Sequence, residues 1–74
     1  QVLRETIRIC TNIDIHKIDS NTSIFNNPEW DSIAHMQILS ILSEKYNFEI
    51  TSEIIMNLSS FELLDDYLKA LKKL

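Results

Sequence analysis

Apolar residues recur at helical spacing in four stretches of the chain, and polar segments separate these stretches. The spacing predicts a helix over residues 2–12, a longer one over 32–46, a short one over about 52–57 and a last one that starts near Ser59. The apolar stripes that define these helices are Leu3, Ile7 and Cys10; Ile38, Ile41, Leu42 and Tyr46; Ile50, Ile54, Ile55 and Leu58; and Phe61, Leu64, Leu68 and Leu71, widened by Leu63 and Tyr67.

Local signals mark where the last two helices begin. Thr51 or Ser52 can cap the short helix, and Ser59 with Glu62 three residues later fits a capping box. Acidic residues then come early in the last helix and basic residues late, an order that complements the helix dipole. These residues are Asp65 and Asp66, followed by Lys69, Lys72 and Lys73.

A long connection, residues 13–31, joins the first two helices. It is rich in Asn, Asp, Ser and Thr, but apolar residues punctuate it, and a loop of this length is uncommon in a compact domain unless it has a function. We expect its apolar residues to pin the loop across the helices. They are Ile15, Ile18, Ile24, Phe25 and Trp30.

The composition favours helices over strands, because the chain contains no glycine and one proline, whereas tight β-turns need residues that tolerate positive φ. Its 74 residues suffice for one small domain. The prediction is therefore a single all-α domain over residues 1–74: a four-helix bundle with a long first loop and a short third helix.

Charge and cysteine content narrow the classes of function. A net charge of −4 disfavours binding to nucleic acid and to anionic membrane surfaces, and no apolar run reaches transmembrane length. Cys10 is the only cysteine, so the chain forms no internal disulfide, and its spacing from His16 and His35 matches no metal site. A free thiol without a secretion signal indicates the cytoplasm, and we expect a monomer because no coiled-coil repeat is present.

The start of the second helix combines polar and apolar residues in an unusual way. Helical projection places Ile33 and Met36 toward solvent beside Ser32, together with the polar stripe of Gln37 and Ser40. Two exposed apolar side chains next to a candidate site suggest a contact surface, although partial burial under the long loop would also explain them.

Ser32 itself permits three interpretations. With Asp31 and His35 it could suggest a catalytic triad, but Asp31 precedes the serine at the helix start, and no glycine-flanked elbow or oxyanion hole accompanies it. The simplest alternative is that Asp31 or Ser32 caps the helix. A third possibility is that Ser32 is an attachment point for a group that the chain does not encode.

The sequence resembles the acyl carrier protein family, which includes peptidyl carrier domains. Asp31-Ser32-Ile33 matches the family's attachment motif at the start of the second helix, and the resemblance continues through residues 32–50 and the "LSSFELLDDYL" of the last helix. It implies that Ser32 receives a 4′-phosphopantetheine arm from coenzyme A through a separate transferase. The arm's thiol then holds an acyl or aminoacyl group as a thioester, and the domain itself is not an enzyme.

The resemblance also assigns expected roles around Ser32. Asp31 would be recognised by the phosphopantetheinyl transferase, and Ile33, Met36, Gln37 and Ser40 would meet the ligase that loads the arm and the enzymes that unload it. Met56, on the short helix, would extend this surface or simply pack. His35 and Trp30 are expected to be packing residues, with His35 hydrogen-bonded in the semi-core, and Cys10 a small core residue.

Two departures from the family suggest a dedicated pathway. The second helix lacks the acidic face with which many fatty-acid carriers dock on basic partners, and Glu29 and Trp30 stand where a glycine often precedes the Asp-Ser pair. We therefore expect a carrier in a specialised biosynthetic pathway, loaded by its own ligase. The alternative is a carrier-like adaptor that binds a protein partner without being modified.

Overall fold

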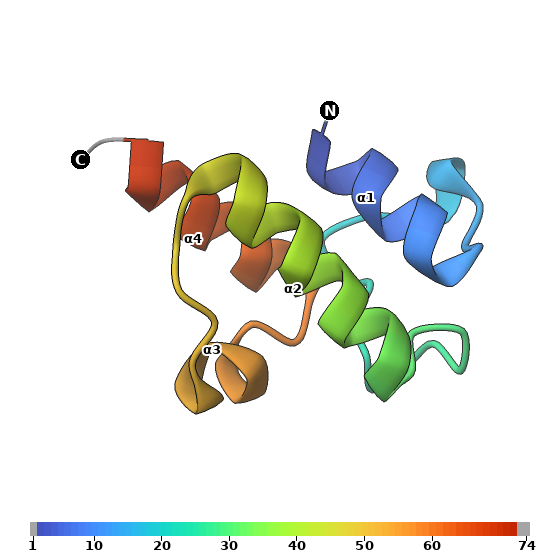
Figure 1. Cartoon of the computed structure of the whole chain (residues 1–74). Coiled ribbons are helices and arrows are strands. Elements are labelled where there is room, and N and C mark those ends of the chain that lie inside the picture. Colours follow the sequence, from blue (N-terminus) through green and yellow to red (C-terminus); the bar gives the residue numbers. More distant parts are fainter. Residues whose placement is uncertain (1, 73–74) are drawn as a thin grey trace.

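The computed structural model describes residues 2–72 and shows an all-α fold (Figure 1). This confirms the predicted class, and two of the predicted helices begin and end where the sequence places them. Lys73 lies outside the described residues. In chain order the elements are α1 (Val2–Thr11), the short 3₁₀ helix η1 (Ile15–Lys17), α2 (Ser32–Tyr46), α3 (Ser52–Asn57) and α4 (Phe61–Lys72).

Asparagine ends the first two long helices in this glycine-free chain. Asn12 and Asn47 adopt left-handed φ values of 63° and 61°, and their amides close the last turns of α1 and α2 on Arg8 and Ser43. Asparagine is one of the few residues other than glycine that tolerates this conformation. Chain reversal after each helix therefore needs no glycine.

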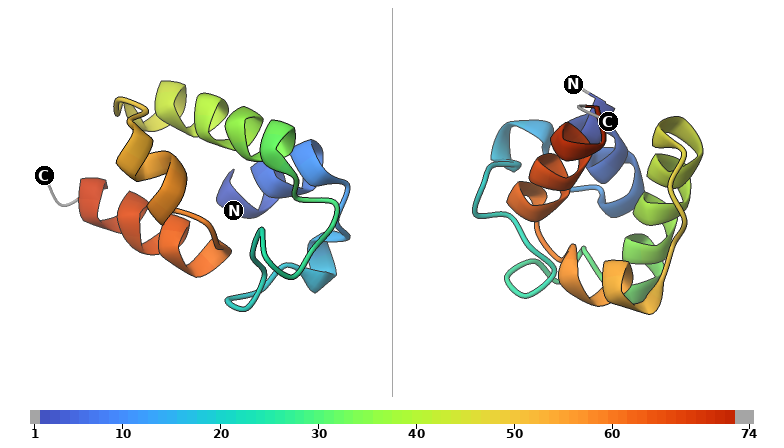
Figure 2. Two further views of the ribbon diagram at one scale, coloured as in Figure 1. Left: turned by 90° about the horizontal axis from the view of Figure 1, so that it is seen from below. Right: turned by 90° about the vertical axis from the view of Figure 1, so that its left-hand side faces the viewer.

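The helices pack around one apolar core. α1 lies against α2 and α4, while α3, seen nearly end-on in Figure 1, crosses the direction of α2 near the start of α4 (Figures 1 and 2). The buried apolar residues are Leu3, Ile7, Ile13, Ile18, Trp30, Ala34, Ile38, Leu39, Leu42, Leu58, Phe61, Leu64 and Leu68.

Three predictions about the helices are wrong in detail: two concern their faces and one concerns a cap. On α2, Leu39 is fully buried, whereas Ile41 is half-exposed and faces α1. On α4, Leu63 does not widen the inner stripe, because it is 44% exposed. The cap of α4 is Ser60, whose hydroxyl accepts from the Leu63 amide at 3.2 Å, so the expected capping box of Ser59 and Glu62 does not form.

The long loop is pinned, but not by all of its apolar residues. Ile18 and Trp30 are buried and Ile24 packs on the core, as expected. Phe25 contradicts the prediction: it is 85% exposed. It lies at the tip of a turn that is closed by hydrogen bonds from the Ser23 amide to Asn26 Oδ1 and from the Phe25 amide to Ser23 Oγ.

Main-chain pairing ties this loop to the start of α4. The Ile24 amide donates to the Ser59 carbonyl and the Phe61 amide to the Thr22 carbonyl, both at 2.9 Å, and Ser23 and Ser60 form an isolated β-bridge. Because this pairing draws Ser59 into an extended segment, the helix cap moves on to Ser60. The loop consequently has a fixed position before it reaches Ser32.

Two features are absent from residues 2–72. None of the helices there is long and apolar enough to cross a membrane. Within the same residues no group of three or more His, Cys, Asp or Glu side chains is placed to hold a metal ion.

Candidate functional site

Ser32 is the first residue of α2, and its side chain is exposed. Asp31 is the cap: its backbone is extended, its Oδ1 accepts from the Ala34 amide at 2.8 Å, and its carbonyl accepts from the His35 amide. The sequence had left Asp31 and Ser32 as alternative caps. Within the part of the chain that the structure describes, the Ser32 hydroxyl makes no hydrogen bond and is available for chemistry.

The catalytic triad is excluded by the position of His35. Its ring is buried, 4% exposed, and both nitrogens are occupied. Nδ1 accepts from the Trp30 indole N–H at 3.0 Å, and Nε2 lies 2.9 Å from the Ile55 carbonyl oxygen. An imidazole held in this way has no free nitrogen to take a proton from Ser32. The expectations that His35 is a hydrogen-bonded core residue and Trp30 a buried anchor are confirmed.

Two open, mainly apolar grooves flank Ser32. One, of about 600 Å³, runs along the outer face of α2, and the other, of about 450 Å³, lies between the long loop, α2 and α3. Ser32 and Met36 line both. The first is completed by Ile33, Gln37, Ser40 and Ile50, the second by Ile24, Phe25, His35, Ile55, Met56 and Ser59.

Large apolar side chains stand exposed around these grooves. Ile33 is 72% exposed, Met36 42% and Met56 75%, which confirms the exposure predicted for the first two and brings Met56 to the same site. Phe25 adds a fourth apolar side chain that the sequence reasoning missed. The available signal was its position directly before the Asn26-Asn27 pair, residues that favour turns.

The outer face of α2 carries little charge near Ser32. From Ser32 to Ser43 the sequence contains no Lys, Arg, Asp or Glu, and the nearest acids are Asp31 and Glu29 before the helix. The field at the serine therefore combines the positive end of the α2 dipole with the negative charge of the neighbouring Asp31 carboxylate, which caps the same helix. A phosphate on Ser32 Oγ would lie beside first-turn amides that lack intrahelical partners, of which the Ala34 amide is already held by Asp31 Oδ1.

These features fit a phosphopantetheine group. The arm needs a hydroxyl to form its phosphodiester, an environment that tolerates the phosphate, and open surface for its chain. Ser32 offers an unengaged hydroxyl, the helix start favours the negative charge, and the two grooves begin at the serine.

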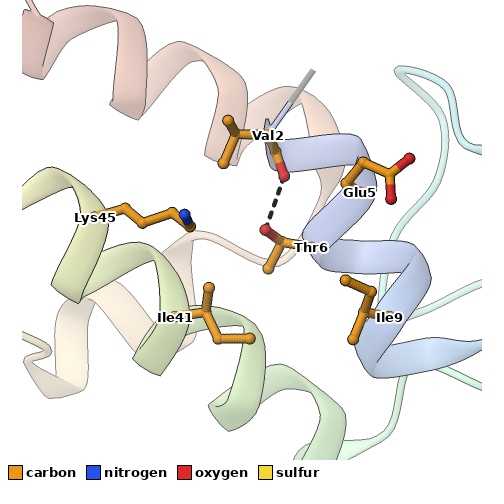
Figure 3. Close-up of a pocket in the computed structure, with 6 residues that line it drawn as sticks. All are labelled: Val2, Glu5, Thr6, Ile9, Ile41 and Lys45. Atoms are coloured by element: carbon orange, nitrogen blue, oxygen red, sulfur yellow. Dashed lines mark hydrogen bonds between the residues drawn. The ribbon is translucent and has the colours of Figure 1, made fainter.

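A third hollow, of about 390 Å³, lies away from this site. It runs between α1 and the second half of α2 and is lined by Val2, Glu5, Thr6, Ile9, Ile41 and Lys45 (Figure 3). The Thr6 hydroxyl inside it donates to the Val2 carbonyl of its own helix at 2.8 Å. Ile41 is nine residues beyond Ser32, about 14 Å along the helix. The hollow follows from the packing of α1 against α2, and its one hydroxyl, that of Thr6, is engaged by the helix backbone.

Cys10 is the other group with nucleophilic chemistry. It is partly buried against the core, and this burial raises the pKa of its thiol above the ordinary value for cysteine. The thiolate is the reactive form, so the shift suppresses its reactivity at neutral pH. The prediction that Cys10 is a packing residue agrees with this environment, although its side chain is not fully enclosed.

A small four-helix domain that holds an unengaged hydroxyl at its surface, with no catalytic partner beside it, has the organisation of a carrier domain. The sequence profile of the phosphopantetheine attachment site family matches residues 1–68, and the chain belongs to this family. It is thus a non-catalytic carrier protein with a 4′-phosphopantetheine prosthetic group, and it depends on a phosphopantetheinyl transferase and on enzymes that modify its cargo. A search of the curated proteins found no match.

Proposed function

We propose that Ser32 is the attachment residue and that the arm on it carries acyl or aminoacyl groups as thioesters. One observation carries this proposal. At the start of α2, Asp31 caps the helix and leaves the exposed Ser32 hydroxyl unengaged. In the transfer, Ser32 Oγ bonds to the phosphorus of the arm, its proton is lost, and the nucleotide part of coenzyme A leaves.

Asp31 has a second proposed role. Its Oδ1 is used by the cap, while the residue is exposed directly before Ser32 and offers a charge for the transferase to recognise. The two roles are compatible because a carboxylate accepts several hydrogen bonds.

The enzymes that load and unload the arm meet an apolar surface around Ser32. It consists of Ile33, Met36, Gln37, Ser40 and Met56, as the sequence suggested, and Phe25 extends it across the loop. Met side chains suit a surface that fits several partners. Docking through apolar contact instead of charge supports service in a specialised pathway with a dedicated loading ligase. We further propose that residues 1–74 act as one monomeric domain and that the lone thiol reflects a reducing, cytoplasmic compartment.

The experiment is intact mass spectrometry after incubation with coenzyme A and a promiscuous phosphopantetheinyl transferase. Ser52→Ala is the matched control for Ser32→Ala, because Ser52 is also an exposed first residue of a helix whose cap, Thr51, precedes it. We expect the wild type and Ser52→Ala to gain one phosphopantetheine, and Ser32→Ala to gain none.

Stability is measured on the same three proteins. Since Asp31 provides the cap, Ser32→Ala should change the free energy of unfolding by about 0.5 kcal/mol or less. Modification that persists in Ser32→Ala would place the arm elsewhere and overturn the assignment.

A further inference from the structure

His35 connects three segments that meet at Ser32. It lies one helical turn after the serine on α2. One ring nitrogen bonds the Trp30 indole, two residues before the serine, and the other bonds the carbonyl of Ile55 on α3, across 20 residues of sequence. The ring is buried, and no buried polar side-chain atom among residues 2–72 lacks a partner.

The two bonds fix the protonation state of the imidazole. An indole N–H only donates, so the Nδ1 that accepts from it carries no hydrogen. A backbone carbonyl only accepts, so the Nε2 that faces Ile55 carries the hydrogen. The geometry therefore requires the neutral Nε2–H tautomer.

The bond to Ile55 matters because α3 is short. Six residues make fewer than two turns, and a helix of this length is not stable without tertiary contacts. The Ile55 carbonyl is one of the last four in α3, which have no partner within the helix. His35 supplies a partner, so an α2 side chain takes part in ending α3.

The same bond sets one wall of the site. Ile55 and its neighbour Met56 line the groove between the loop, α2 and α3, and Ser32 and Met36 form the opposite side. Trp30 at the other ring nitrogen is 1% exposed and anchors the loop that leads into Ser32. Loss of the two imidazole hydrogen bonds would therefore let both α3 and the end of the loop move relative to Ser32.

We propose that His35 is a positioning residue: through its neutral tautomer it fixes α3 and the loop end against the start of α2, and so holds the groove beside Ser32 in the form that partner enzymes bind. The part of this proposal that concerns enzymes rests on the attachment of the arm to Ser32. The part that concerns the tautomer and α3 does not.

The first test is the ¹⁵N NMR signature of the ring, with His16 as an internal control because His16 is exposed and its ring makes no hydrogen bond to residues 2–72. We expect His35 to show an unprotonated Nδ1 and a protonated Nε2, with slow solvent exchange of the Trp30 indole proton. His16 should show an averaged tautomer mixture. An Nδ1–H tautomer, or averaging at His35 like that at His16, would overturn the proposal.

The second test compares His35→Leu with His35→Gln. Leucine keeps apolar packing but removes both bonds, whereas the glutamine amide retains a donor for the Ile55 carbonyl. We expect amide hydrogen exchange at Ile55 in α3 and at its C-terminal cap, Leu58, to accelerate about tenfold in His35→Leu, as for a lost buried hydrogen bond, and to be largely rescued in His35→Gln. Exchange at Ile7 in α1 should not change.

Transferase kinetics add a readout that a general loss of packing would not give. Lower occupancy of the binding-competent form should raise KM about tenfold in His35→Leu with kcat unchanged, and the protein should still be fully modified at the end of the reaction. Equal behaviour of the leucine and glutamine variants would overturn the positioning role.

Two further outcomes need their own interpretation: a His35→Leu variant that does not fold, and a wild type that is never modified. If His35→Leu does not fold, Trp30→Phe tests the other bond: it should raise KM and accelerate exchange in α3, and unchanged values would contradict the proposal. A wild type that never gains the arm would refute the role of Ser32, while the NMR and exchange results would still decide the role of His35.

Discussion

The two longest helices, α2 and α4, use their apolar residues differently. On α4, Phe61, Leu64 and Leu68 are buried and the outer face is mainly charged. On α2, Ile38 and Leu42 are just as deeply buried, but Ile33 and Met36 point outward, so apolar side chains lie on both faces. A helix that serves only the core needs one apolar face, and the second apolar face of α2 is therefore best explained by contacts outside the domain.

The starts of the two helices show the same contrast. Asp31 caps α2 and Ser60 caps α4, each by accepting an amide three residues on. On α4 the cap precedes Phe61, which is buried, and on α2 it precedes Ser32, which is exposed. Similar backbone geometry thus serves packing in one helix and presents a hydroxyl in the other.

The largest expected effect is a difference in unfolding free energy between substitutions on the inner and outer faces of α2. Ile38→Ala should lower the free energy of unfolding by about 2–5 kcal/mol, because it opens a cavity in the core, whereas Ile33→Ala should change it by about 0.5 kcal/mol or less. Urea denaturation measures both. If Ile38→Ala does not fold, Ile38→Val should still show a loss of about 0.5–1.5 kcal/mol. Similar losses for positions 33 and 38 would mean that Ile33 supports the fold.

A second prediction compares equally exposed apolar residues on the two helices. Met36 and Leu63 are 42% and 44% exposed, so Met36→Glu and Leu63→Glu change charge and exposed surface alike. Met36→Glu should raise KM with the transferase and with the loading ligase about fivefold to tenfold, since a partner must then bury a carboxylate. Leu63→Glu should leave both unchanged.

A stability measurement is the control for this second comparison. Urea denaturation should show both glutamate variants within about 1 kcal/mol of the wild type. Unchanged kinetics for Met36→Glu would remove Met36 from the partner surface, and a KM raised equally by Leu63→Glu would show that the added charge, not its position, matters.

The smallest effect concerns the two caps. Asp31→Ala and Ser60→Ala should each cost about 1 kcal/mol in unfolding free energy, and Asp31→Ser should restore most of that loss because serine also caps. If the transferase uses the Asp31 carboxylate, Asp31→Ser should still be modified more slowly than the wild type. Mass spectrometry over time measures the rate, and a wild-type rate in Asp31→Ser would limit Asp31 to capping.

The sequence predicted the features that depend on local spacing. The bounds of α2 and α3, the outward direction of Ile33 and Met36 and the inward direction of His35 all follow from helical periodicity. The tethering of His35 to Trp30 and Ile55 does not, because it joins a loop, α2 and α3, whose approach no local pattern encodes.

Tertiary packing explains two of the misses, and a local turn explains the third. Ile41 is partly exposed because it lines the hollow between α1 and α2, whereas Leu39 is fully buried in the core. The cap of α4 lies at Ser60 because Ser59 pairs with Ile24 in the loop. Phe25 is exposed because side-chain bonds around Ser23 close a turn beneath it. The first two results depend on contacts between segments that are distant in sequence, whereas the turn around Phe25 is local.

The main-chain pairing between residues 22–24 and the start of α4 has a consequence for how this protein can diversify. Backbone bonds hold the loop whatever side chain follows Ile24, so position 25 can vary with little effect on the helices or on the direction of Ser32. Phe25 lines the same groove as Ser32, on a loop whose backbone is held in place. If Ser32 carries the arm, position 25 is a place where selection or protein engineering can alter the choice of partner enzyme with little effect on folding.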